Sequence, residues 1–390
     1  MLYPWLDWQR SLLAAWLEAG RLASRATPLE PLFRPPQELV ARTLAAGEVS
    51  RRPLEEVIRR DAPFPVRGEA IATTPFVRLV HLHRPGRAQR HRFLLLAPHS
   101  GYATAVLSPL ATTLAALGEV VVTDWVDARL APLAEGPFGL AEQIAVAVYA
   151  AVALGGPAHL VALSQSGPVV LALAAMLAAE EPELVPASLV FLGCQLDPKA
   201  AHTPLQQMLS AWPREALVRQ LTTTVGPGYP GAGRRVYPAV LQLLAYSLAS
   251  PQLYAEVQQG LFRELSAGIA GIYARQHADI HSLLDVPGEL FTDMLEWILG
   301  EAAWEGDAPV IAGRARELGR LRSIPLLTVE SAEDELVGAG QTHALSRRLH
   351  RSRARAITLP GGRHHDLFTG PGFFRATAPA LRRFYAELDA

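Results

Sequence analysis

The sequence predicts an α/β fold with a mainly parallel central sheet, helices on both faces of that sheet, and a helical cap inserted late in the chain. Two observations lead to this prediction. Between residues 93 and 192, short runs rich in Val, Leu and Phe alternate with apolar segments of helical period, a rhythm typical of parallel strands buried between helices. The alternation stops between about residues 197 and 305 and resumes at Ile324, which indicates an insertion into the core.

The first 75 residues are expected to form a helical N-terminal segment and a connector. A stripe of large apolar side chains follows helical spacing within residues 1–25: Trp5, Trp8, Leu12 and Trp16. Two interpretations stay open, since such a stripe can pack on the body of the protein or meet an apolar partner. Prolines between residues 28 and 36 indicate a connector, and the charged segment from Arg51 indicates a solvated helix.

The core is expected to begin at residue 76 with an alternating segment, FVRLVHLH, which predicts a strand at a partly exposed edge of the sheet. Buried strands are expected at 93–97, 119–123, 159–163, 187–192, 324–329 and 356–359. Helices are expected at 103–117, 140–153, 169–179 and 343–349, and again at the C-terminus. This assigns residues 76–197 and 305–390 to the core and residues 198–304 to a helical cap or lid.

Composition excludes several classes of protein. Half of the 390 residues are hydrophobic, which excludes wholesale disorder, and a net charge of -1 gives the chain no global attraction for nucleic acid. Cys194 is the only cysteine, so one chain can form neither an internal disulfide nor a cysteine-based metal cluster.

Membrane insertion and export are also disfavoured. Residues 143–179 contain no Asp, Glu, Lys or Arg, but a Gly-Gly-Pro run at 155–157 and a Gly-Pro pair at 167–168 interrupt them. The remaining pieces are too short to span a bilayer. The N-terminus lacks the basic region of a secretory signal, and Asp7 interrupts its apolar run. We therefore expect a cytoplasmic protein without an integral membrane span.

Ser164 stands where a nucleophilic serine would be expected. It directly follows the buried run HLVAL and directly precedes a helix, which is the strand-turn-helix setting of the nucleophile elbow in α/β-hydrolases. The usual pattern has glycine two residues before and after the serine, whereas this chain has Ala162 and Ser166. The alternative is that Ser164 only caps the helix.

A base and an acid follow in the order that this fold requires. Asp334 lies just after the strand expected at 324–329, and His364 follows the strand expected at 356–359. Both side chains should reach the same edge of the sheet as Ser164, so the three can form a catalytic triad. Alternatives are a solvated acidic loop and a surface histidine pair. Adjacent histidines do not aim easily at one ion, so a metal site at His364 and His365 is disfavoured.

The remaining candidate residues surround this triad. The backbone N–H groups of Gln165, at a helix N-terminus, and Ser100, in a glycine-containing loop after a central strand, are the expected oxyanion donors. His99, Tyr102 and His365 are candidates for the wall of the substrate pocket.

Several longer motifs resemble those of the intracellular polyhydroxyalkanoate depolymerases, which are α/β-hydrolases related to the polyester synthases. The motifs are VVVTDWVDARLAP at 120–132, YPGAGRRVYPAVLQ at 229–242 and GAGQT at 338–342. The N-terminal MLYPWLDWQRSLL, the strand-end LAPHSG and the later HHDLFTG fit the same family. The resemblance therefore extends over nearly the whole chain.

The resemblance implies hydrolysis of poly(3-hydroxybutyrate) or a similar polyester by Ser164, Asp334 and His364, without metal or organic cofactor. Relatives commonly carry a cysteine in a short Cys-Gln box at the nucleophile position, where this chain has Ser164-Gln165. Cys194-Gln195 repeats that dipeptide but lacks the elbow setting, so we interpret Cys194 as non-catalytic.

The leading functional prediction is a serine ester hydrolase that acts on polyester granules or on a small ester substrate. Ser164 would attack the ester carbonyl as His364 accepts its proton, Asp334 would orient the imidazole, and water would release the acyl-enzyme. A carboxylesterase for soluble esters and a non-catalytic granule-associated protein remain as alternatives, because fold does not determine function. Neither monomer length nor oligomeric state follows from the sequence.

Overall fold

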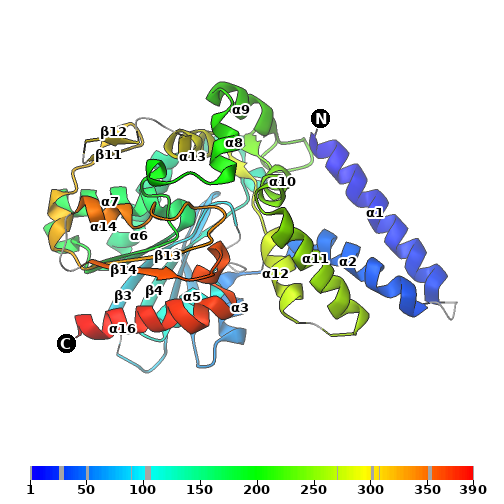
Figure 1. The fold of residues 1–390 in the computed structure, drawn as a ribbon, viewed down its shortest axis with the longest axis horizontal. Coiled ribbons are helices and arrows are strands. Elements are labelled where there is room, and N and C mark those ends of the chain that lie inside the picture. Colours follow the sequence, from blue (N-terminus) through cyan, green and yellow to red (C-terminus); the bar gives the residue numbers. More distant parts are fainter. Residues whose placement is uncertain are drawn as a thin grey trace.

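A computed structural model gives the arrangement of the chain. It describes residues 2–25, 30–49, 52–88, 90–101, 107–269, 271–299, 303–306, 308–349 and 354–389. An eight-stranded sheet of order β1-β2-β4-β3-β5-β6-β13-β14 forms its centre (Figure 1). The strands are Arg67–Thr73 (β1), Val77–His83 (β2), His91–Leu96 (β3), Gly118–Trp125 (β4), His159–Leu163 (β5), Ser188–Leu192 (β6), Leu326–Ser331 (β13) and Ala354–Leu359 (β14).

Strand directions give the sheet one functional edge. β2 runs antiparallel to both of its neighbours, while β4, β3, β5, β6, β13 and β14 are all parallel. The carboxyl ends of these parallel strands therefore meet at one edge, where open α/β sheets bind their ligands. This strand order, with its single antiparallel strand, is that of the α/β-hydrolase fold.

Helices cover both faces of the sheet (Figure 1). On one face lie Leu54–Asp61 (α3), Ser108–Ala115 (α5) and Ala378–Leu388 (α16). On the other face lie Leu140–Ala153 (α6), Gly167–Glu180 (α7) and Ala344–Arg348 (α14). Nearly every side chain of α7 from Pro168 to Leu177 is buried, because this apolar helix follows β5 into the middle of the core. The predicted α/β architecture is confirmed.

The edge of the sheet differs from the prediction. The segment that begins at Phe76 was expected to form an edge strand. It forms β2, which pairs with β1 on its outer side, so β1 is the edge strand and β2 is an interior strand. β1 has the sequence RGEAIAT and is largely exposed along its length, so it carries no run of buried side chains that would mark it as a strand. The sheet thus begins within the segment 1–75 that sequence reasoning assigned to helices and a connector.

The prediction of a proline-rich connector is also wrong for most of that segment. Residues 30–49 form a helix, Glu30–Val49 (α2), with Pro35 and Pro36 inside it. Each proline removes a backbone donor and normally ends a helix. Here α2 packs against α1 (Leu2–Arg25) and against two cap helices, Pro251–Ser266 (α11) and Ile272–His281 (α12). Tertiary packing therefore outweighs the local proline signal.

The proposed cap lies between β6 and β13 and consists mainly of helices. Besides α11 and α12 it contains Pro204–Ser210 (α8), Arg214–Leu221 (α9), Ala239–Ala249 (α10) and Gly288–Leu299 (α13). A small sheet, not predicted, joins Thr223–Thr224 (β7), Arg235–Tyr237 (β8) and Val286–Pro287 (β9). A second small sheet follows at Trp304–Glu305 (β10), Ala308–Ile311 (β11) and Arg314–Ala315 (β12).

Two indole groups tie this region to the functional edge of the sheet. Trp297 Nε1 donates a hydrogen bond to the carbonyl of Gln195 at 2.6 Å, and Trp304 Nε1 donates to the carbonyl of Leu196 at 3.0 Å. Both acceptors follow β6, so the cap is anchored beside the carboxyl ends of the strands.

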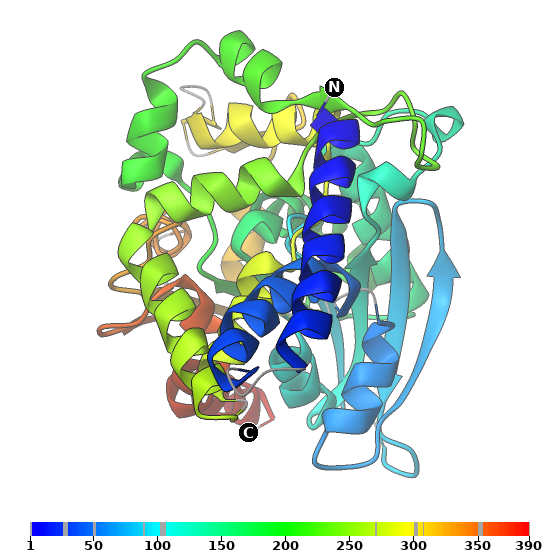
Figure 2. The same cartoon turned by 90° about the vertical axis from the view of Figure 1, so that its right-hand side faces the viewer.

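The N-terminal helix α1 lies beside the cap (Figures 1 and 2). Tyr3 donates a hydrogen bond to Asp285, and Tyr229 donates to Asp7 at 2.6 Å. The predicted stripe does not pack inward, since Trp5, Trp8 and Trp16 are 51%, 59% and 56% exposed. Among the described helices, none combines the length and the hydropathy needed to cross a bilayer.

Candidate active site

The turn after β5 has the backbone conformation of a nucleophile elbow. Ser164 has a φ of 48°, a left-handed value that costs energy for a side chain other than glycine. Ser166 helps to hold the turn, because its Oγ accepts from the Leu163 N–H and donates to the Leu96 carbonyl, both at 2.9 Å. A serine two residues after Ser164 thus fastens the elbow to β3, where other members of the fold have glycine.

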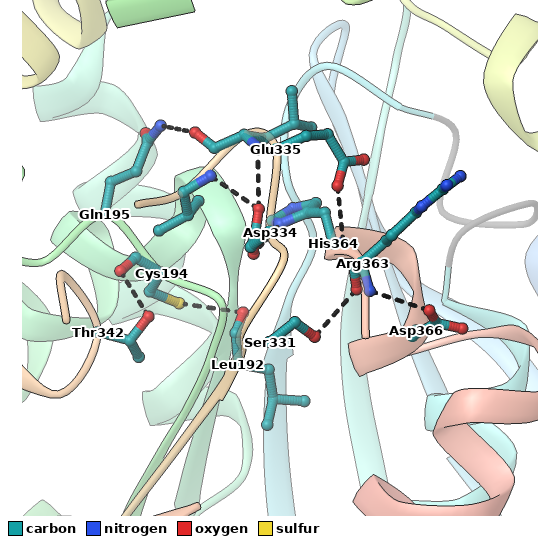
Figure 3. A network of polar contacts seen from close by, with 12 residues as sticks. Leu192, Cys194, Gln195, Ser331, Asp334, Glu335, Thr342, Arg363, His364 and Asp366 are labelled. Carbon is teal, nitrogen blue, oxygen red and sulfur yellow. Dashed lines mark hydrogen bonds and ion pairs between the residues drawn. The ribbon is translucent and has the colours of Figure 1, made fainter. Parts of the chain in front are cut away.

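The acid and the base predicted from sequence lie in direct contact. His364 Nδ1 and Asp334 Oδ2 are 2.8 Å apart, and both side chains are almost fully buried (Figure 3). The other carboxylate oxygen of Asp334 accepts from the backbone N–H groups of Leu336 and Val337 at 2.9 and 2.8 Å. Because the Asp334 carboxylate accepts from Nδ1, the proton of a neutral His364 is held there and Nε2 is left as the acceptor.

The environment of His364 stabilises its protonated form. Burial opposes protonation, but the charge and hydrogen bond of Asp334, with a smaller contribution from Glu335, outweigh it and raise the pKa of His364 above its usual value. Glu335 Oε2 also accepts a hydrogen bond from the His364 backbone N–H at 3.2 Å. The residue after the proposed acid therefore supports the base through its backbone.

A cavity of about 340 Å³ brings the predicted residues together. Ser164 and His364 both line it, as do Ser100 and Gln165, whose backbone N–H groups are the proposed oxyanion donors. Its remaining wall comes largely from apolar cap residues, including Leu205, Met208, Leu209, Leu241, Leu244, Leu248, Leu290, Phe291, Met294 and Leu295. The cavity is thus suited to an uncharged, largely apolar ester.

Two of the three expected pocket residues line this cavity, and both are neutral histidines. His99 stacks on Trp125 with ring centroids 4.7 Å apart, and burial lowers its pKa to about 3. Burial and the nearby His364 lower the pKa of His365 to about 4. Tyr102, the third expected residue, lies outside the described part of the chain.

The TDWVDAR motif supports the strand-end loop that contains Ser100. Thr123 Oγ1 accepts from the Ala97 N–H and Trp125 Nε1 donates to the Ala97 carbonyl, both at 2.9 Å. Trp125 also stacks on His99. The motif therefore fixes the position of the loop from the neighbouring strand and does not itself line the cavity.

The later motif GRRVYP performs a similar structural task. Arg234 is almost fully buried and donates to the carbonyls of Ala131 and Gly136, each at 2.9 Å. Gly231 lies so close to this segment that a Cβ would come within 2.7 Å of the Arg129 carbonyl oxygen. The motif thus joins the cap to the segment that follows β4.

Cys194 lies behind the elbow and away from the cavity. Its side chain is fully buried, its Sγ is 3.6 Å from the Leu192 carbonyl, and it lines neither of the two cavities found near the site (Figure 3). Burial raises the pKa of this thiol well above its usual value. A buried neutral thiol lacks both the access and the charge that a nucleophile needs.

Sequence reasoning missed the residues that the cap contributes to the cavity. Tyr246 on α10 and Asp279 on α12 both line it, and Tyr246 donates to Glu335 Oε1 at 3.5 Å. Apolar positions on α8 and α10 have the spacing of ordinary core residues, so only the folded chain distinguishes a cavity wall from a core.

Comparison with known proteins gives one family match. The family model described as PHB de-polymerase C-terminus matches residues 193–389, which is half of the chain. No curated protein matches the sequence.

Solved structures of hydrolases also align with the chain. A monoacylglycerol lipase from Paleococcus ferrophilus is 15% identical, with 78% of this chain and 96% of the lipase covered and a TM-score of 0.48. A thermophilic esterase from Thermogutta terrifontis is 12% identical, with 82% and 97% covered and a TM-score of 0.43. The family assignment rests on the sequence match over residues 193–389.

Proposed function

Because the chain belongs to the PHB depolymerase family and is an ester hydrolase, we propose that it cleaves polyhydroxyalkanoate, a poly(3-hydroxybutyrate)-like polyester, with Ser164 as nucleophile. His364 is the proposed general base and Asp334 the residue that orients it. The backbone N–H groups of Gln165 and Ser100 would stabilise the oxyanion. His364 would then protonate the leaving alcohol, and water would hydrolyse the acyl-enzyme by the same route.

The observation that carries this proposal is the strained elbow at Ser164, which lines the same cavity as His364, while His364 in turn contacts the buried Asp334. A helix-capping serine needs no left-handed φ, so the strain at Ser164 favours an exposed nucleophile over a simple cap. The apolar wall of the cavity favours a polyester, whose repeats are uncharged away from the chain ends.

Release of 3-hydroxybutyrate from native amorphous granules tests the substrate. The same preparation is assayed on a soluble 4-nitrophenyl ester as a reference. Hydrolysis of both supports a polyester hydrolase. Hydrolysis of the soluble ester alone would identify a carboxylesterase, and hydrolysis of neither by wild-type protein would contradict catalysis.

We further propose that α1 brings the protein to the surface of the granule. Its exposed indoles present apolar area that tolerates contact with water at an interface. Leu244 and Leu248 on α10 are also exposed and line the cavity, and α10 lies on the same side of the molecule as α1 (Figures 1 and 2). A granule surface bound by α1 would therefore lie on the same side of the molecule as the exposed Leu244 and Leu248 of the cavity wall.

The double variant Trp5→Ser with Trp8→Ser is expected to lose granule association and polymer hydrolysis severalfold while keeping hydrolysis of a soluble ester. Both side chains are more than half exposed, so the melting temperature should change little. Co-sedimentation with granules, both activities and thermal unfolding are measured together. Tyr3→Ser is the contrasting variant, because Tyr3 is buried against Asp285 and its loss should lower the melting temperature. Equal loss of both activities in the tryptophan variant, with a lowered melting temperature, would contradict the interfacial role.

Activity is expected to rise with pH through the pKa of His364. Only the neutral imidazole can accept the Ser164 proton, and Asp334 raises the pKa of His364 above its usual value of about 6.5. The midpoint of kcat/KM against pH should therefore lie above that value in the wild type. A profile that is flat from about pH 6 to about pH 9 would exclude His364 as the base.

A further inference from the structure

Among the residues that the structure describes, the wall of the reaction cavity has one acidic side chain and no arginine or lysine. That side chain is Asp279, and the other titratable groups of the described wall are tyrosines and the histidines His99, His364 and His365. Among the described residues, arginine enters only the wall of the adjoining second cavity, as Arg275 and Arg363. A negative charge in this wall would act differently on neutral and on anionic substrates.

Asp279 lies on α12 and belongs to the walls of two adjoining cavities. The second cavity, of about 260 Å³, shares Tyr246, Asp279, Ile280 and His365 with the first. His365 is the neighbour of the proposed base, so this shared wall lies beside the place where the leaving alcohol would be protonated. Asp279 therefore lies in the part of the wall that the two cavities share.

The carboxylate of Asp279 has no hydrogen-bond or ion-pair partner among the described residues. Within the described ranges it accepts no hydrogen bond and forms no ion pair within 4.0 Å, although Arg275 lies one turn earlier on the same helix. Arg275 lines only the second cavity. Burial raises the pKa of Asp279 to about 7, while Arg275 acts in the opposite direction. Such an unpaired carboxylate has no structural partner that would explain its position.

We propose that Asp279 is a specificity-determining residue that makes the reaction cavity accept uncharged ester segments and reject those that carry a free carboxylate near the scissile bond. This inference rests on the proposed polyester function. A polyester chain carries one carboxylate, at the end that becomes part of the leaving alcohol when the last ester is cleaved. Repulsion between that group and Asp279, in a cavity of low polarity, disfavours cleavage of the last ester relative to esters within the chain.

The second cavity gives a matched control. Glu256 lines it but not the reaction cavity, and it is exposed beside Arg363 at 3.8 Å. Its charge is therefore screened by solvent and by a cation. Glu256→Gln removes one negative charge near the site, as Asp279→Asn does, without changing the wall of the reaction cavity.

The test compares two substrates that differ in charge at the terminal carboxyl group. The dimer of 3-hydroxybutyrate is used as its free acid and as its uncharged methylamide, at about pH 9, where Asp279 is ionised in the free protein. The wild type should hydrolyse the internal ester of the methylamide with a kcat/KM at least about tenfold above that of the free acid. Asp279→Asn should reduce that preference by about tenfold, the effect of roughly 1.4 kcal/mol. Glu256→Gln should leave the preference unchanged.

Circular dichroism shows whether Asp279→Asn is folded, and Glu256→Gln, which lies outside the wall of the reaction cavity, should leave hydrolysis of 4-nitrophenyl butanoate unchanged. A preference that is the same in wild type and Asp279→Asn, or a wild type that cleaves both dimers equally, would overturn the inference. Failure of the polyester proposal would be seen separately, as no release of 3-hydroxybutyrate from granules by wild-type protein.

Discussion

Ser164→Ala is expected to lower ester hydrolysis by roughly three orders of magnitude or more, because it removes the atom that forms the acyl-enzyme. Ser164 occupies the left-handed position of the elbow and lines the cavity with His364. Residual activity should reflect only the oxyanion donors and substrate binding. The measurement is kcat/KM on a soluble ester and on granules, with circular dichroism to show that the variant is folded.

Cys194→Ala is the control for that experiment. The thiol is buried, and Gly167 approaches Cys194 so closely that a Cβ on the glycine would lie 2.7 Å from the Cys194 Cβ. Replacement by alanine leaves a small cavity, so a loss of stability of about 1 kcal/mol is expected, with turnover largely kept. An inactive but folded Cys194→Ala beside an active Ser164→Ala would reverse the assignment of the nucleophile.

Asp334→Asn and His364→Ala are each expected to lower kcat by several orders of magnitude, on the order of 10⁴-fold for the asparagine. An amide in place of the carboxylate can donate to Nδ1, which would favour the wrong tautomer of His364. It would also remove the charge that stabilises the imidazolium. Because triad members act as a unit, the double variant should lose little more than either single variant. Steady-state kinetics of the three variants check this.

Neighbouring residues provide the controls for the acid and the base. Glu335→Gln keeps an oxygen that can accept from the His364 N–H, a contact of 3.2 Å in the structure, so it should reduce turnover only slightly. His365→Ala removes part of the pocket wall but no proposed proton acceptor, so it should affect KM more than kcat. A dead His365→Ala together with a working His364→Ala would mean that the assignment within this loop is wrong.

The central part of the fold could be predicted because its residues are nearly all apolar. The strand His159–Leu163 and the helix Leu140–Ala153 have the bounds that the sequence indicates, since an uninterrupted buried run bounded by Gly and Pro leaves little choice. Strand β1 could not be predicted because it is exposed and shows no burial pattern. Strands β7, β8 and β9 could not be predicted because two or three residues are too few to show a period. Pro35 and Pro36 misled for a different reason: their helix is held by contacts distant in sequence.

The candidate site also contains residues that the sequence predicts and residues that it does not. Ser164, Asp334 and His364 were proposed from their places at strand ends, and parallel topology alone brings such places together. Asp334 and His364 do lie in contact. Asp279 and Tyr246 could not be found this way, because a helical cap can fold over a sheet in many ways and its sequence does not say which side chains face the cavity. The orientation of the N-terminal tryptophans was equally open, since an amphipathic helix shows its stripe but not what covers it.

The central claim, that Ser164 is the nucleophile, is tested most directly by mapping a covalent adduct. A fluorophosphonate reacts with an activated serine and leaves a stable mass on that residue. After digestion, mass spectrometry of the wild type should locate the adduct on the peptide that contains Ser164, and prior protonation of His364 at low pH or its replacement by alanine should slow labelling. An adduct on another residue, or labelling that persists in Ser164→Ala and disappears in Cys194→Ala, would contradict the account.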